Sequence, residues 1–139
     1  MHVNMNRTIV VEWRHIASES GETCDRCTAT GEALHAAVAA IGPFLEAKGV
    51  GVEVRETLLP HSGLSESNTV LIDGLPLERW LGGARVVETE CPSCAALTGK
   101  PQACCRALVT NTGVHEALTP AAIAAALLMA SGVEGADRP

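Results

Sequence analysis

The stretch from residue 22 to residue 27, Glu22-Thr23-Cys24-Asp25-Arg26-Cys27, contains a C-x-x-C pair between a predicted strand and a predicted helix. Two cysteines at this spacing suit two kinds of chemistry: they can cycle between a dithiol and a disulfide, or they can supply half of a soft-metal site. At the start of a helix, a thiolate at Cys24 gains from free backbone N–H groups and from the positive end of the helix dipole. The secondary structure on both sides of the pair therefore decides both the fold and the site.

A strand, a helix and a second strand are predicted around this pair. Residues 8–16 are β-branched and apolar on both parities at their start, which predicts a central strand covered on two faces. Residues 24–49 carry one apolar stripe at helical spacing, with a kink expected at Pro43 and a helix end at Lys48-Gly49. Residues 50–58 alternate as a second strand. This order is a βαβ unit, so the two strands should be parallel with a right-handed crossover.

The second half of the chain predicts further strands and a last helix. Residues 68–72 form a third strand that ends at Asp73-Gly74, and residues 75–80 are either a short strand or a helical turn. Residues 82–102 are expected to be irregular, and residues 106–117 to form a hairpin. Thr119-Pro120 begins the last helix and Gly132 ends it. The fold class that follows is α/β, a small sandwich.

Composition and charge exclude several classes of function. A chain of 139 residues has the size of one domain, its net charge is -6, and it has no cluster of Lys or Arg, so nucleic acid is not an expected partner. The first residues lack the apolar region of a signal peptide, and the apolar run 120–130 is far shorter than the roughly 20 residues of a membrane span. We therefore expect a cytoplasmic protein without a membrane partner. Because cytoplasmic thiols are kept reduced, its six cysteines indicate redox or metal chemistry.

A second cysteine group, Cys91-x-x-Cys94 followed by Cys104-Cys105, leaves several interpretations open. Four thiols within 15 residues can form a structural zinc site, act as relay thiols for the first pair, or hold an iron–sulfur cluster or heavy metal. Adjacent cysteines in an extended chain point to opposite sides, so one of the last two is expected to be free. A further arrangement joins both C-x-x-C pairs in one zinc site, although 63 residues separate them.

The chain resembles the thioredoxin-like superfamily, and within it the glutaredoxin-like proteins. The resemblance lies in a strand, a C-x-x-C at a helix start, a helix with an internal proline, and the strand-turn 70–74 (VLIDG). More narrowly, the chain resembles a small prokaryotic family of uncharacterised function, through residues 11–15 (VEWRH), the cysteine box, residues 67–78 and the second cysteine group. The resemblance implies a thioredoxin-like sandwich. It departs from thioredoxins at Ser67-Asn68, where their active site has a cis-proline; here a trans loop is expected.

These observations predict a single domain over residues 8–132, with a cysteine-rich insertion at 81–106 and a disordered tail at 133–139. The first functional hypothesis is a thiol–disulfide oxidoreductase in which Cys24 attacks and Cys27 resolves the mixed disulfide. Its partner would be a protein or a small thiol or disulfide. The alternative is a non-enzymatic metal- or metalloid-binding protein, and a third hypothesis is an interaction module stapled by its cysteines. His15 is expected to be a surface or half-buried side chain, and Arg26 a solvent-facing one.

Overall fold

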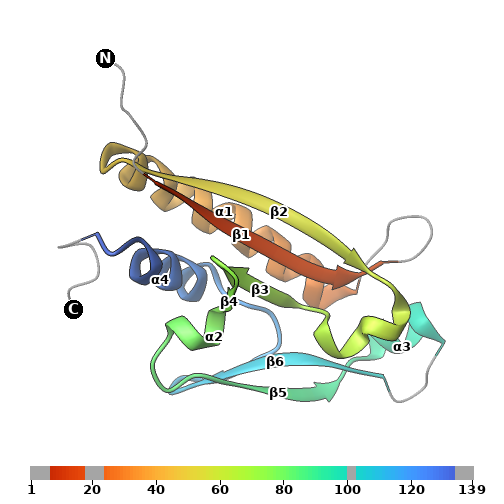
Figure 1. Ribbon diagram of the computed structural model, residues 1–139. Coiled ribbons are helices and arrows are strands. Elements are labelled where there is room, and N and C mark those ends of the chain that lie inside the picture. Colours follow the sequence, from red (N-terminus) through yellow and green to blue (C-terminus); the bar gives the residue numbers. More distant parts are fainter. Residues whose placement is uncertain (1–6, 18–23, 100–102, 134–139) are drawn as a thin grey trace.

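The computed structural model describes residues 7–17, 24–99 and 103–133, without the side chains of residues 64, 65 and 105. Within these ranges the chain forms a four-stranded sheet in the order β2-β1-β3-β4 and a three-stranded sheet in the order β5-β6-β7. Figure 1 shows the first sheet lying along α1, with β5 and β6 on the far side of β3 and β4.

The predicted order of elements is confirmed: a βαβ unit, further strands and a C-terminal helix make a mixed α/β fold that is compatible with a thioredoxin-like sandwich. Residues 75–80, left open between strand and helix, form both. The elements are β1 (Arg7–Ile16), α1 (Asp25–Ala47), β2 (Val50–Leu59), the 3₁₀ helix η1 (His61–Glu66), β3 (Thr69–Ile72), β4 (Leu75–Pro76), α2 (Leu77–Trp80), β5 (Arg85–Glu90), α3 (Pro92–Thr98), β6 (Cys104–Thr110), β7 (Gly113–His115) and α4 (Pro120–Ser131).

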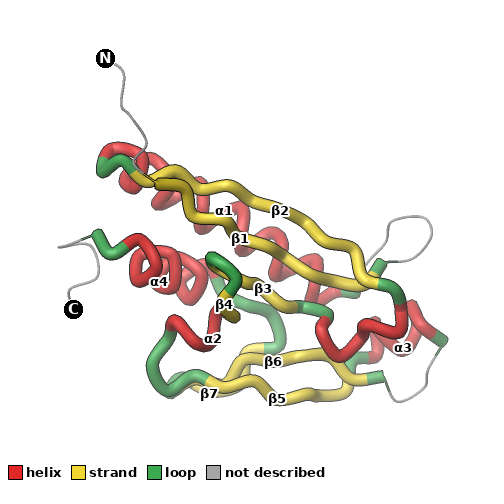
Figure 2. The backbone as a smooth tube through the Cα atoms, viewed as in Figure 1, coloured by secondary structure: helices red, strands yellow, loops and turns green. Residues whose placement is uncertain are grey.

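Strand β1 is the centre of the first sheet. It pairs in parallel with β2, as the βαβ unit predicts, and antiparallel with β3. One parity of β1 is buried, including Ile9, Val11 and Trp13, whereas Glu12 and Arg14 on the other parity are half-buried and form an ion pair at 2.9 Å. The expected central strand is confirmed, but only one of its two faces is fully covered. Helices α1 and α4 contact each other, and α4 also contacts β1 and β3, so both helices pack on one face (Figure 2).

The two long helices begin and end where the sequence predicts. Helix α1 continues through Pro43 to Ala47, and Gly49 follows with a φ of 82°. In α4 the Thr119 side chain accepts a hydrogen bond from the backbone N–H of Ala122 at 3.1 Å, and Gly132 ends the helix with a φ of 66°. Among the described residues, no helix is long and apolar enough to cross a bilayer.

The segment 82–102, expected to be irregular, instead contains β5 and α3. Strand β5 pairs antiparallel with β6, which places Glu90 opposite Cys104. The physical reason is that β5 obtains its hydrogen bonds from residues 104–109, a pairing that its own charged sequence does not indicate. The hairpin predicted for residues 106–117 is confirmed by the β6–β7 pairing.

Candidate functional site

The first C-x-x-C lies at the start of α1. Cys24 is the N-cap residue with extended backbone, and its Sγ accepts a hydrogen bond from the N–H of Cys27 at 3.4 Å. The backbone N–H of Thr28 donates to the Cys24 carbonyl at 2.9 Å, which closes the first turn. The helix thus begins at Asp25, not later in the chain, and the Cys24 sulfur satisfies one of the N–H groups that a helix start leaves free.

The second C-x-x-C is built in the same way at the start of α3. Cys91 is the N-cap residue and Pro92 occupies the first helical position, where its missing N–H is no loss. The N–H of Ala95 donates to the Cys91 carbonyl at 2.9 Å, and Gly99 ends the helix with a φ of 74°. In both turns the first cysteine is the N-cap residue and the second is the third residue of the helix, but only the Cys24 side chain accepts a capping hydrogen bond.

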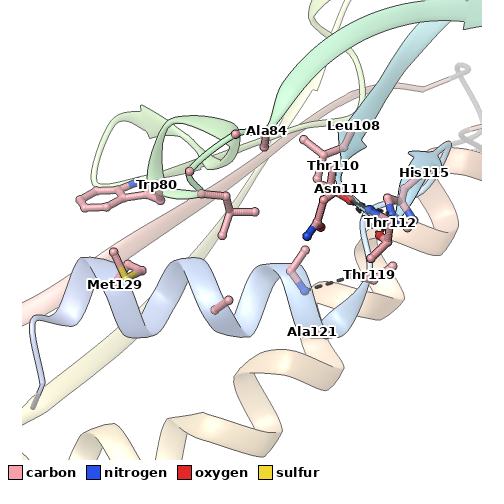
Figure 3. A pocket seen from close by; sticks show the side chains of 15 residues that line it. Trp80, Ala84, Leu108, Thr110, Asn111, Thr112, His115, Thr119, Ala121 and Met129 are labelled. Carbon is pink, nitrogen blue, oxygen red and sulfur yellow. Dashed lines mark hydrogen bonds between the residues drawn. The ribbon is translucent and has the colours of Figure 1, made fainter. Parts of the chain in front are cut away.

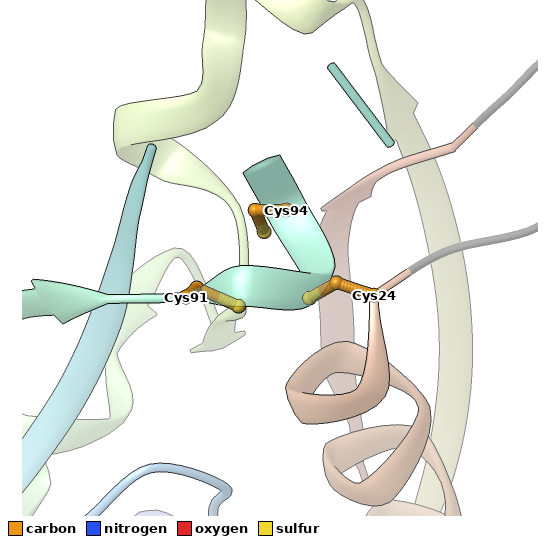
Figure 4. A group of neighbouring side chains, drawn as sticks. All are labelled: Cys24, Cys91 and Cys94. Carbon is orange, nitrogen blue, oxygen red and sulfur yellow. The ribbon is translucent and has the colours of Figure 1, made fainter. Parts of the chain in front are cut away.

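These two helix starts lie against each other. The backbone N–H of Asp25 donates to the Ser93 hydroxyl at 3.0 Å, across 68 positions of sequence. The sulfur atoms of Cys24, Cys91 and Cys94 lie within 4.8 Å of one another, and Figure 4 shows them turned into the space between the two turns. We call these three residues the thiol triad. Their exposed fractions are 0%, 2% and 0%, so the triad is a buried cluster.

The buried environment changes the chemistry of Cys94. Burial raises the pKa of this thiol well above its ordinary value, and the neighbouring Cys24 and then Cys91 raise the pKa further. Without a cation, three thiolates this close together would repel each other in a medium of low dielectric constant. A bound cation would reverse that balance, because it compensates the negative charge of the sulfurs.

Cys27 is buried but does not belong to the triad. Its Sγ shares a hydrogen bond with the Ser67 hydroxyl at 3.2 Å, and that hydroxyl accepts from the N–H of Ile16 at 3.0 Å. Ser67 therefore lies beside the C-x-x-C pair, where the resemblance places it. The described residues contain no cis peptide bond, which confirms the trans loop. Asn68 has a φ of 64°, and its side-chain amide donates to the carbonyls of Arg106 and Glu116, both at 3.0 Å.

Arg26 lies at the candidate site in an environment that its sequence does not predict. It is 7% exposed, not solvent-facing. Its guanidinium donates to the Thr89 hydroxyl at 2.5 Å, to the carbonyl of Glu90 and to the Glu116 carboxylate at 3.1 Å. Glu90 directly precedes Cys91, so Arg26 ties the first helix turn to the backbone that carries the second. Its position between Cys24 and Cys27 is the one sequence signal for this role.

The remaining site candidates lie elsewhere. His15 is buried, in contrast to expectation: its ring stacks on Trp13 with 4.0 Å between centroids, and its Nε2 lies 2.5 Å from a Glu56 carboxylate oxygen. Cys104 is half-buried at the start of β6, and the side chain of Cys105 is outside the described residues. A metal site formed by Cys91, Cys94, Cys104 and Cys105 stays a prediction. Of the cross-pair arrangement, the structure brings three of the four thiols together and leaves out Cys27.

A cavity of about 560 Å³ lies away from the triad, between α4, the β6–β7 turn and the segment after α2 (Figure 3). Trp80, Leu108 and Met129 contribute apolar walls, and at one end His115 Nε2 shares a hydrogen bond with the Thr112 hydroxyl at 2.8 Å. Its volume is that of a small-molecule site, but its side chains indicate no particular ligand chemistry. The thiol triad is the more specific candidate.

Comparisons with known proteins match most of the described part of the chain. The family model described as "Domain of unknown function (DUF2703)" matches residues 9–127. The chain is 36% identical over 112 residues to an uncharacterized protein of Archaeoglobus fulgidus, an alignment that covers 78% of this chain and 77% of the relative. No solved structure gives a significant match. With almost its whole described length matched, the chain belongs to the DUF2703 family.

Proposed function

We propose that this protein binds a soft metal ion through the thiolates of Cys24, Cys91 and Cys94. The observation that carries the proposal is the convergence of three buried sulfur atoms within 4.8 Å, contributed by two helix starts far apart in sequence. Thiolate ligands favour soft and borderline ions such as zinc or copper(I), whereas magnesium and calcium require oxygen ligands.

The spacing of the three sulfur atoms is close to the spacing of thiolate ligands around a bound ion. With zinc–sulfur bonds of about 2.3 Å, tetrahedral ligands lie roughly 3.8 Å apart, so the triad needs only small side-chain rotations to close on an ion. Zinc, the ion expected from the sequence, takes four ligands. A fourth would come from a water molecule, an external thiol or one of the predicted ligands Cys104 and Cys105.

The framework that holds the triad is independent of an ion. The Asp25–Ser93 hydrogen bond and the bonds of Arg26 to Thr89 and Glu90 fix the two turns against each other. A preformed site requires less ordering when the ion binds, and this favours affinity. An ion that binds only the folded state also stabilises that state.

A second candidate function is thiol–disulfide exchange by Cys24 and Cys27, on a thioredoxin-like fold and with a protein or small disulfide as partner. The observation that favours it is the N–H of Cys27 donating to the Cys24 sulfur at the start of a 23-residue helix, where a thiolate is stabilised. Against it, Cys24 is 0% exposed, so an external disulfide would reach it only after the site opens.

Metal content and thiol protection on one anaerobically purified sample separate the two candidates. Metal binding predicts one ion per chain and protection of Cys24, Cys91 and Cys94 from alkylation. A chelator that removes the ion should make these three thiols reactive. Exchange chemistry predicts a metal-free chain in which Cys24 alkylates fastest and a Cys27→Ser variant retains a mixed disulfide at Cys24. An ion that leaves the three triad thiols unprotected would contradict the metal proposal.

A further inference from the structure

The number of thiols in the triad bears on which ion it takes, an inference that rests on the proposed metal-binding function. Three sulfur atoms from Cys24, Cys91 and Cys94 converge. Divalent zinc completes a set of four ligands. Trivalent arsenic and antimony instead form neutral complexes with three thiolates, in which a lone pair occupies the remaining position. The triad matches the ligand number of a trivalent metalloid.

Charge balance in a buried site points the same way. Three thiolates around a divalent ion leave one net negative charge, and around a monovalent ion they leave two, whereas a trivalent centre leaves none. All three residues are at most 2% exposed, so a residual charge would be buried at a free-energy cost.

In the part of the chain that the structure describes, Arg26 lies beside the triad but does not cancel such a residual charge. The Arg26 guanidinium, which bonds to the carbonyl before Cys91, is already paired with the Glu116 carboxylate at 3.1 Å. The N-terminus of α1 contributes roughly half a positive charge, and the N-terminus of the shorter α3 contributes less, so together they offset part of one thiolate. A neutral complex needs no such compensation.

We infer that the triad binds trivalent arsenic or antimony, taken up as the neutral hydroxide, in preference to divalent metal ions. In the exchange, three S–H bonds and three arsenic–oxygen bonds break. Three arsenic–sulfur bonds form, and three water molecules leave with the thiol protons. The oxidation states of arsenic and sulfur do not change, so the step requires no oxidant or reductant.

The test is a competition between arsenite and zinc on the reduced full-length chain, kept reduced with a phosphine because dithiols bind arsenic. Equilibrium dialysis with both present, followed by metal analysis, should show one arsenic per chain and roughly a tenfold or greater preference for arsenic over zinc. A tenfold change in affinity corresponds to about 1.4 kcal/mol, and the free-energy cost of a buried net charge exceeds this value. Native mass spectrometry should show that the chain gains the mass of one arsenic atom and loses the mass of three hydrogens.

Variants assign the arsenic to the triad. In a background carrying Cys104→Ser and Cys105→Ser, arsenite binding should persist. Adding Cys24→Ser should weaken arsenite binding by at least about 100-fold, by analogy with the loss of ligand-supporting groups. The same variant should still bind phenylarsine oxide, which needs only the two thiols of Cys91 and Cys94. Its circular-dichroism spectrum and urea unfolding transition should match those of the parent, which shows that the variant is folded.

Each contrary result has a distinct meaning. If cadmium or zinc binds at the triad and arsenite does not, or if zinc displaces arsenite, the metalloid inference is overturned while the metal-binding proposal stands. Arsenite binding that survives Cys24→Ser undiminished, or that disappears in the Cys104→Ser and Cys105→Ser background, also overturns it. If zinc, cadmium and arsenite all fail to bind the reduced chain, both proposals fall.

Discussion

The two C-x-x-C turns have the same local structure and different surroundings. In each, the first cysteine is the N-cap residue of a helix and the second is the third residue of that helix. In α3 both sulfurs, from Cys91 and Cys94, join the triad, whereas in α1 only Cys24 does and Cys27 bonds to Ser67. Both pairs therefore lie at a helix start, while the residues packed opposite each turn determine which thiols can share a ligand.

The largest expected effect tests this difference directly. Cys94→Ser removes a triad thiol and should weaken cadmium binding by at least about 100-fold, as measured by titration of the thiolate charge-transfer absorbance. Cys27→Ser changes the equivalent position of the other turn and should weaken binding less than tenfold, because Cys27 lies outside the triad. Equal losses in both variants would mean that the turns act as one four-thiol site.

The next prediction concerns the residue that joins the turns. Arg26→Met keeps an apolar stem but leaves the Glu90 carbonyl and the Thr89 hydroxyl without their buried donor. We expect the free energy of unfolding to fall by about 2–3 kcal/mol, measured by urea titration. The matched control is Arg55→Met, whose ion pair with Glu53 is exposed and should contribute less than about 1 kcal/mol. Equal effects would show that Arg26 does not hold the turns together.

A third prediction concerns how the first turn is seated on the sheet. Gly31, one helical turn beyond Cys27, lies under the Trp13 ring, and a Cβ there would be 2.5 Å from the ring. Gly31→Ala should therefore destabilise the fold by about 1–3 kcal/mol through overpacking. Gly42→Ala is the control: its nearest neighbour would be 3.9 Å away, and a net effect below about 1 kcal/mol is expected, because the gain in helix propensity opposes the cost of a Cβ before Pro43. Thermal unfolding of both variants provides the measurement, and a stabilised Gly31→Ala would refute the close contact.

The smallest expected effect is a pH dependence specific to the second turn. Because the pKa of Cys94 is raised in the folded metal-free protein, the unfolded chain, with its thiol pKa near the ordinary 9.0, loses this proton first as pH rises. The contribution of this thiol to the free energy of unfolding is therefore constant below about pH 9. Above that pH the free energy of unfolding should decline, by at most about 1.4 kcal/mol per pH unit. Cys94→Ala should show a shallower decline in urea titrations between pH 8 and about 10. Identical pH profiles would contradict the raised pKa.

Much of the first turn was predictable because its signals are local. A β-branched strand, the cysteine pair and an apolar stripe at helical spacing together place Cys24 at a helix start, and α1 begins there. The strand pairing of β1 with β2 follows from the βαβ order alone.

The second turn and the triad were not predictable in the same way. Strand β5 is stabilised by pairing with β6, a contact distant in sequence. Its own charged sequence, taken alone, predicts a loop. The triad joins Cys24 to Cys91 across 66 intervening residues and omits the nearer Cys27, and no spacing rule distinguishes these thiols. The burial of Arg26 likewise results from β5 and Glu116, whose positions are fixed only by the tertiary structure.

The position of the triad has a consequence for the cooperativity of folding. Cys24 belongs to the helix packed on the first sheet, while Cys91 follows a strand of the second sheet, 67 positions later. An ion held by both is a cross-link that closes this long loop. By the chain-entropy relation for disulfides, such a closure is worth about 4 kcal/mol. The two sheets should therefore unfold as one cooperative unit when the ion is bound, and chelation should separate their transitions.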